Sequence, residues 1–120
     1  MPQPTSIVDL LRAGIQAEGA RQKTIASNIA NIETPGYRRQ DVQFERLLAE
    51  ALESGGDIDL EALDPTVHEP RNTPLKANGN DVAMETEIGN LVKNSLRHTA
   101  FVRLLRKKFS QMEAALNTRG

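Results

Sequence analysis

Apolar residues near the N-terminus recur at the three- and four-residue steps of an amphipathic helix. Ser6 is suited to cap the start of this helix, because its side chain can accept a backbone hydrogen bond. Thr34-Pro35-Gly36 closes it, since the residue before a proline avoids helical dihedrals and glycine tolerates positive φ. The pattern predicts a helix from about residue 6 to about residue 31. A polar interval divides its stripe into two parts, which are Ile7, Leu10, Leu11 and Ile15, then Ile25, Ile29 and Ile32.

The C-terminal third carries a longer apolar ladder with alternating steps of four and three residues. Ser95 and His98 fill its two polar positions. A 3.5-residue period held over four heptads is typical of a coiled-coil seam, so Leu105 and Phe109 are expected to lie between packed helices and Lys107 outside them. The helix would be about 50 Å long at 1.5 Å per residue. We define the apolar ladder as Met84, Ile88, Leu91, Val102, Leu105, Phe109, Met112 and Leu116.

The segment between these arms has a different character. Residues 44–52 are compatible with a short helix that ends at Ser54-Gly55-Gly56. Residues 57–81 contain three prolines and an Asn78-Gly79-Asn80 turn, which predicts loop or disorder. The expected fold is all-α, with long N- and C-terminal helices that pack as a coiled-coil-like hairpin around a flexible or irregular middle. Residues 1–36, 37–80 and 81–120 form the three parts, and both termini build one core domain.

Composition and charge limit the possible functions. Hydrophobic residues make up 38% of the 120 residues and aromatic residues 3%, so the chain has little apolar surface for a self-sufficient core. The net charge is −1, but residues 41–69 hold nine acidic residues and one arginine, whereas residues 97–120 hold six basic residues and one glutamate. These regions can attract one another within or between copies. The N-terminus shows neither a cleavable secretory signal nor a membrane span, so we expect no membrane insertion.

No motif in the sequence indicates catalysis. His68 and His98 lack a metal-ligand spacing, cysteine is absent, and no nucleophile elbow or phosphate-binding loop occurs. We expect no enzymatic activity, metal site or cofactor. The basic run Arg103, Arg106, Lys107 and Lys108 raises the alternative of nucleic-acid binding, but such runs usually form a solvated helix face and aromatic interleaving is absent. We therefore expect no nucleic-acid partner.

Two stretches resemble one known family. The run Ser27-Asn28-Ile29-Ala30-Asn31-Ile32-Glu33-Thr34-Pro35-Gly36-Tyr37 is similar to the N-terminal signature of the rod, hook and hook-associated proteins of the bacterial flagellum. Asn78-Gly79-Asn80-Asp81-Val82, followed by Met84-Glu85 and a long helix, resembles the C-terminal half of the proximal rod proteins in that family. The chain departs from the family at Ile32-Glu33, where a small residue and Asp or Asn are more common, and at His98, where Tyr is expected.

The resemblance implies a structural subunit of the flagellar rod, a helical drive shaft for motility. Its partners would be copies of itself, other rod proteins, the adaptor between the MS ring and the rod, and the export apparatus. It would lie in the periplasmic rod of the basal body, exported by the flagellar type III apparatus without a cleavable signal peptide. Two alternatives remain open: another axial protein such as FlgC, or a soluble helical-hairpin adaptor or chaperone.

Candidate subunit-interface residues come from the signature and from the apolar ladder. Asn28 and Asn31 share a helix face, where their amides can bind carbonyls of an adjacent helix and fix its register. Two solvated asparagines near a helix end are the plainer interpretation. A type II turn is predicted at Thr34, Pro35, Gly36 and Tyr37. This turn would hold Tyr37 either as an anchor in an interface between subunits or in packing within the chain. The ladder contributes Leu91, Val102, Leu105, Phe109 and Met112.

Overall fold

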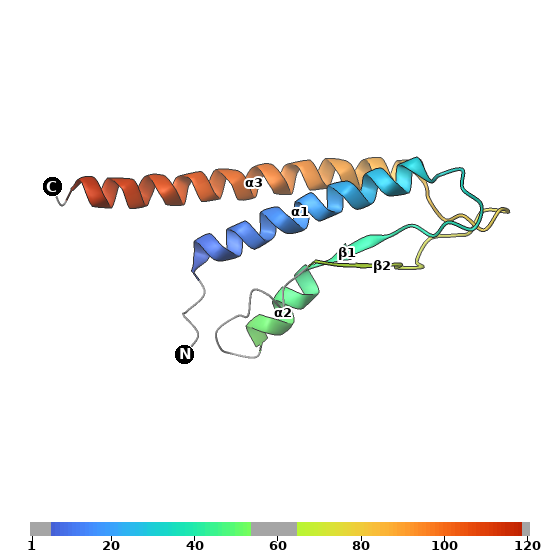
Figure 1. Cartoon of the computed structure of the whole chain (residues 1–120), viewed down its shortest axis with the longest axis horizontal. Coiled ribbons are helices and arrows are strands. Elements are labelled where there is room, and N and C mark those ends of the chain that lie inside the picture. The colour runs from blue at the N-terminus through green and yellow to red at the C-terminus, as the bar shows by residue number, and fades with distance from the viewer. Residues whose placement is uncertain (1–5, 54–64, 119–120) are drawn as a thin grey trace.

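The computed structural model describes residues 6–53 and 65–118. Two long helices, α1 (Ile7–Ala30) and α3 (Met84–Asn117), lie side by side and run in opposite directions (Figure 1). The molecule is elongated, with extents of 67 × 28 × 16 Å. The predicted mostly helical hairpin with long terminal helices and an irregular middle is confirmed. α3 is the longer helix, and it continues past the start of α1 (Figure 1).

Both predicted ends of α1 are confirmed, with the mechanism that the sequence indicated. The Ser6 hydroxyl accepts a hydrogen bond from the Asp9 backbone N–H at 3.1 Å, and the helix stops at Asn31. The chain then turns sharply, because the Tyr37 N–H donates to the Thr34 carbonyl at 3.2 Å and Gly36 has φ +75°. A type II turn requires a positive φ at its third position, and proline is common at its second position.

The face of α3 that packs against α1 is not the apolar ladder, and this corrects the expected burial of Phe109. Glu87 and Asn94 face α1 and are only 0% and 4% exposed, whereas Phe109 is 49% exposed. The contact face follows the same alternation of three- and four-residue steps as the ladder, one residue earlier in sequence, through Glu87, Asn90, Asn94, Arg97 and Phe101. The α1-contacting positions of α3 therefore do repeat every 3.5 residues on average, but most of the residues at these positions are polar.

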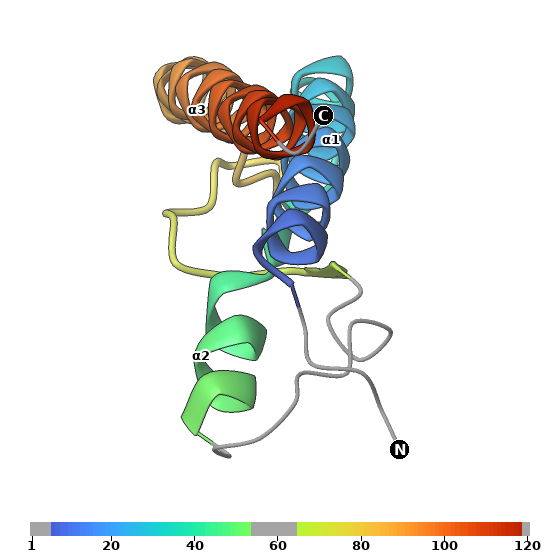
Figure 2. The ribbon, with the colours of Figure 1, turned by 90° about the vertical axis from the view of Figure 1, so that its left-hand side faces the viewer.

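The middle segment contains more regular structure than the sequence predicted. β1 (Asp41–Gln43) pairs antiparallel with β2 (Thr66–His68), and Val42 lies opposite Val67. The short predicted helix is confirmed as α2 (Glu45–Glu53). α2 projects from one side of the α1–α3 pair (Figure 2). β2 corrects the expectation that residues 57–81 are wholly irregular, while residues 54–64, including Ser54-Gly55-Gly56, lie outside the described residues.

The interior between these elements is small and largely polar. Ala17 of α1 and Phe44, which precedes α2, form a cluster with Ala13, Leu47 and Leu48, and this cluster attaches α2 to the helical pair. Charged and amide side chains occupy most other buried positions of the described chain. The buried polar residues are Glu18, Arg21, Thr24, Asn28, Arg39, Asn80, Asp81, Glu87 and Asn94.

Candidate interface and the polar clamps that shape it

Asn28 uses its complete hydrogen-bonding capacity inside the chain. Its amide nitrogen donates to the Gln40 carbonyl at 2.8 Å and to Glu87 Oε2 at 3.1 Å. Its amide oxygen accepts from the Tyr37 hydroxyl at 3.1 Å and from the Gln40 N–H at 2.9 Å. An amide has two donors and two acceptor sites, so nothing is left unpaired. Asn28 thus ties α1 to the segment after the turn and to α3.

Glu87 and Arg39 complete this first site, which we call the turn-end clamp: Asn28, Arg39 and Glu87. Arg39 Nε donates to Glu87 Oε1 at 2.8 Å, and their side chains are 4% and 0% exposed. A carboxylate removed from water in this way is costly unless both of its oxygens have partners. Here Arg39 binds one oxygen and Asn28 the other, so the buried charge is compensated.

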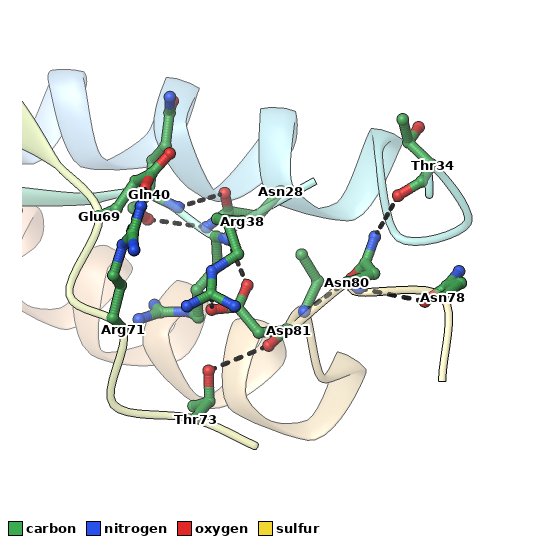
Figure 3. Close-up of polar contacts among 12 residues, drawn as sticks. Asn28, Thr34, Arg38, Gln40, Glu69, Arg71, Thr73, Asn78, Asn80 and Asp81 are labelled. Carbon is green, nitrogen blue, oxygen red and sulfur yellow. Dashed lines mark hydrogen bonds and ion pairs between the residues drawn. The ribbon is translucent and has the colours of Figure 1, made fainter. Parts of the chain in front are cut away.

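The Asn78-Gly79-Asn80-Asp81 turn packs against the Thr34-Pro35-Gly36-Tyr37 turn. The Asn80 side-chain amide donates to the Asn31 carbonyl at 2.9 Å and to the Thr34 carbonyl at 2.8 Å, and Figure 3 shows the contact with Thr34. The Asn80 amide oxygen accepts the Val82 N–H at 2.8 Å. The last carbonyls of a helix lack partners within the helix. Asn80 therefore caps the end of α1 from a position 49 residues away from Asn31.

Two glycines allow these turns to approach closely. The Gly36 N–H donates to the Asn78 carbonyl at 2.9 Å, and Gly79 has φ +83°. A Cβ atom on Gly79 would lie 3.5 Å from the Gly36 Cα. The adjoining Asp81 carboxylate accepts the Arg39 N–H and lies 3.7 Å from Arg38 Nε in an ion pair (Figure 3). The two motifs of the sequence thus form one structural unit.

A second polar site, the mid-helix clamp, lies farther along the helical pair and consists of Glu18, Arg21, Asn94 and Arg97. The Asn94 amide donates to both the backbone carbonyl and Oε2 of Glu18, at 2.7 and 2.9 Å. Glu18 Oε1 accepts from Arg97 Nε at 2.9 Å and from Arg21 Nη1 at 2.5 Å. Glu18 is 1% exposed. Its charge is therefore balanced by one arginine from each helix.

Arg21 also reaches α2 through an ion pair with Glu45. Partial burial raises the pKa of Glu45, but the hydrogen bond and the positive charge of Arg21 outweigh that effect, so the pKa lies below its ordinary value. Burial lowers the pKa of Arg21, but Glu45 and Glu18 raise it above its ordinary value overall. Both groups are charged at neutral pH, and their attraction holds the start of α2 against α1.

Comparison of the sequence with known proteins shows the family of this chain. Residues 11–38, which include parts of both clamps, match the family described as "Flagella basal body rod protein". The flagellar basal body rod protein FlgB of Bacillus subtilis (strain 168) is 30% identical over 105 residues, which cover 80% of this chain and 81% of the relative. The chain belongs to the FlgB family. FlgB of Escherichia coli (strain K12) is 32% identical over 97 residues, with 65% and 69% covered. FlgB of Borrelia hermsii is 27% identical over 127 residues, with 91% and 94% covered.

Membership in the FlgB family identifies the chain as a structural rod subunit of the flagellar basal body that associates with other rod components. The relatives favour neither FlgC nor a soluble adaptor or chaperone. Among the described residues, no helix has the length and apolar character needed to cross a bilayer, and no cluster of metal-ligating side chains occurs.

The signature residues predicted as interface contacts make many of their contacts within this FlgB-family chain. Asn31 is half-buried, and its amide donates to the Ser27 carbonyl at 2.8 Å and accepts from the Thr34 hydroxyl at 3.1 Å. Tyr37 is half-buried, with its hydroxyl between Ser27 and Asn28. Thr34, Pro35 and Gly36 are exposed at the tip of the hairpin. A contact of this tip with a neighbouring subunit stays a prediction.

The predicted ladder residues fall into two groups. Leu91, Val102 and Leu105 are half-buried beside the contact with α1, while Phe109 and Met112 are 49% and 52% exposed. The structure thus brings the first three to the edge of the helical pair and leaves the last two on the surface. Their role in contacts between subunits also stays a prediction.

Sequence reasoning assigned no role to Glu18, Arg39, Glu87 or Asn94. The spacing of two of these residues did indicate a shared helix face, because Glu87 and Asn94 are seven residues apart and lie on one face of α3. A search for apolar periodicity ignores such positions. Arg39 carries no periodic signal, since it lies in the irregular segment after the turn.

Proposed function

We propose that this FlgB-family chain is a proximal rod subunit that assembles through the uncovered apolar surface of α3, with copies of itself and with other rod proteins. One observation carries the proposal: a single helix leaves a long series of large apolar side chains exposed. Exposed apolar surface of this extent marks an interaction site rather than a solvated face. The series comprises Ile88 (51% exposed), Val92 (55%), Leu96 (67%), Leu104 (51%), Phe109 (49%), Met112 (52%) and Leu116 (71%).

The two clamps support this role by fixing the hairpin without using these apolar residues. Asn94 and Glu87 occupy the α1-facing side of α3, so polar contacts set the register of the pair. The large apolar residues remain available for neighbouring subunits. A subunit of a shaft that transmits torque needs such a fixed shape, because each contact is repeated along the assembly.

We further propose that the chain has no catalytic role. Both oxygens of Glu18 and of Glu87 are bound by arginine or asparagine side chains, so neither carboxylate is placed to accept a proton from a substrate. This is the pattern of structural ion pairs. The adaptor between the MS ring and the rod, the export apparatus and a periplasmic position are proposed from the family resemblance.

Deletion of the gene, followed by complementation, tests the proposed function. The deletion strain is expected to be non-motile and to lack complete rods by electron microscopy of isolated basal bodies. The gene supplied in trans is expected to restore both, and the protein should be detected in purified basal bodies. A deletion strain that swims and builds complete rods would contradict the proposal.

A further inference from the structure

Asn78 is followed directly by a glycine, and this pair is a candidate site of spontaneous chemical modification. Asn78-Gly79 is the one Asn-Gly pair in the 120 residues. Asparagine is thermolabile, because the backbone nitrogen that follows it can attack the side-chain amide carbon. A glycine at the following position has no Cβ to hinder that attack. The Asn78 side chain is exposed, so burial does not protect it from reaction.

The modification requires only water and a base. The Gly79 nitrogen loses its proton and forms a bond to Cγ of Asn78, while the Cγ–Nδ2 bond breaks and Nδ2 takes up a proton and leaves as ammonia. The product is a five-membered succinimide ring. Water then opens the ring at either carbonyl. Attack at Cγ gives an aspartate, whereas attack at the main-chain carbonyl carbon gives an iso-aspartate, whose backbone runs through Cγ and is longer by one methylene group.

The turn around Asn78 keeps the reacting atoms apart. The Gly79 N–H donates to the Lys76 carbonyl at 2.9 Å, which closes a β-turn with Asn78 at its third position. Asn78 does not have a positive φ, so the turn is type I rather than type II. The third residue of a type I turn has ψ of about 0°, which places the next nitrogen beside its own backbone nitrogen. Ring closure instead needs the Gly79 nitrogen beside Cβ of Asn78, so the Cα–C bond of Asn78 must rotate.

Three hydrogen bonds of the folded chain oppose this rotation. It breaks the bond from Gly79 to Lys76, and it moves the Asn78 carbonyl away from the Gly36 N–H, which donates to it at 2.9 Å. The Asn78 side chain is also held, because its Oδ1 accepts the Asn80 N–H at 3.1 Å (Figure 3). The bond from Gly36 joins this turn to the turn after α1. The closed pair of turns therefore protects Asn78.

We propose that Asn78 is a site of spontaneous succinimide formation that the closed turns suppress and that becomes reactive when the turns separate. Asn80 controls the separation, because its buried side chain binds the carbonyls of Asn31 and Thr34 at the end of α1. The inference concerns the folded state of a single chain, so it does not depend on the proposed function.

Conversion to iso-aspartate prevents the turns from closing again. The carbonyl that accepted the Gly36 N–H becomes part of a free carboxylate, and the added methylene group displaces Asn80 from the end of α1. Conversion to aspartate changes neither the length of the backbone nor the side-chain oxygen that accepts the Asn80 N–H. The iso-aspartate form therefore stays open at the tip of the hairpin, whereas the aspartate form closes.

Peptide mass spectrometry of the purified full-length protein tests the proposal. The protein is incubated at mildly alkaline pH in its folded state, which circular dichroism verifies, and in guanidinium chloride. Conversion of Asn78 should be about ten- to a hundredfold slower in the folded protein, because the reaction must first break two or three hydrogen bonds. The exposed Asn72, which precedes a threonine, should react slowly in both conditions. Equal rates at Asn78 in the two conditions, or no conversion in guanidinium chloride, would overturn the proposal.

Asn80→Ala tests the role of the closed turns. It should raise the rate of Asn78 conversion several-fold in the absence of denaturant and leave the rate in guanidinium chloride unchanged. Lys76→Ala is the matched control, because Lys76 is exposed and contributes its backbone to the turn, and it should change neither rate. A folded Asn80→Ala protein that reacts as slowly as the unsubstituted protein would refute the protective role of the turns. If Asn80→Ala does not fold, the comparison of folded and denatured unsubstituted protein decides.

The iso-aspartate form and the Asn78→Asp variant separate the effect of the longer backbone from that of the new charge. The iso-aspartate form is isolated by chromatography after incubation in guanidinium chloride and is refolded by removal of the denaturant. It should melt at a lower temperature than Asn78→Asp, which should melt close to the unsubstituted protein. Equal melting temperatures of the two modified proteins would show that the turns close despite the longer backbone and would overturn that part of the proposal.

Discussion

Asn94 binds Glu18 twice, because its side-chain amide contacts both the backbone carbonyl and the carboxylate of that residue, at 2.7 and 2.9 Å. The two residues are 76 positions apart in sequence. A shift of α3 by one residue would remove both acceptors of the buried Asn94 amide and the donor to Oε2 of the buried Glu18 carboxylate. A single buried asparagine can set the register of paired helices in this way. The contact explains how a hairpin with few buried apolar residues keeps one alignment.

Replacement of Asn94 by alanine is expected to destabilise the hairpin. The substitution removes two hydrogen bonds to a buried partner, and the expected loss is about 1–3 kcal/mol of unfolding free energy. Chemical denaturation followed by circular dichroism measures it. Ser95→Ala, at the next and exposed position of the same helix, should change the unfolding free energy by less than about 0.5 kcal/mol. Equal effects of the two substitutions would contradict the register role of Asn94.

The helix boundaries could be predicted from the sequence because local chemistry determines them. Ser6 caps α1, and the turn after Asn31 ends it, through contacts with nearby residues. The face of α1 that contacts α3 could not be predicted, because apolar residues occupy only some of its positions and small, amide or charged residues occupy the others. Six of the eight buried positions of α1 follow steps of three and four residues, at Leu11, Gly14, Glu18, Arg21, Ile25 and Asn28. Glu18 and Arg21 resemble solvated positions until their partners on α3 are known.

The two strands of the middle segment could not be predicted from the sequence either. β1 and β2 have three residues each, and only Val42 is buried among the six paired residues. Alternation of apolar and polar residues needs about four residues to give a signal. Likewise, the chain contained both turn motifs, but the contact between Asn80 and the end of α1 depends on a distant part of the sequence.

Two glycines of α1 are expected to respond oppositely to alanine. Gly19 has open space where a Cβ atom would lie, so Gly19→Ala should stabilise the protein by about 0.5–1 kcal/mol through helix propensity. A Cβ on Gly14 would lie 2.9 Å from the Phe101 ring, so Gly14→Ala displaces that ring. We expect Gly14→Ala to lower the melting temperature and Gly19→Ala to raise it. Combining Gly14→Ala with Phe101→Leu should recover part of the loss, and no recovery would place the strain elsewhere.

The ion pair of Arg21 and Glu45 predicts a pH-dependent contribution to stability. The folded-state pKa of Glu45 lies below its ordinary value of 4.5, so the contribution is complete above that pH and is lost as the pH falls through the lower folded-state pKa. Because the Glu45 side chain is 62% exposed, Glu45→Gln should cost less than about 1 kcal/mol at pH 7. Thermal melts from pH 7 to pH 3 should show this difference shrinking. The exposed Glu33→Gln serves as the control, with a smaller difference at every pH.

The apolar ladder predicts a separation between folding of the monomer and assembly of the rod. Leu105 is half-buried beside α1, so Leu105→Ala should cost about 1–2 kcal/mol, less than a fully buried leucine. Phe109 is 49% exposed, and Phe109→Ala should change the unfolding free energy of the monomer by less than about 0.5 kcal/mol. Both substitutions should nevertheless reduce swimming, because Phe109 is available for contacts with other subunits and Leu105 supports the helix that presents it.

Lys107→Ala provides the matched control for this pair, since Lys107 is exposed and lies two residues from Phe109. Its loss should affect neither the melting of the purified chain nor motility in soft agar. Assembly repeats the same contact at each subunit, so a small loss per contact accumulates along the rod, and motility should report Phe109→Ala more steeply than monomer stability does. Phe109→Ala cells that build complete rods, together with Lys107→Ala cells that do not, would show that the other side of α3 makes the contact between subunits.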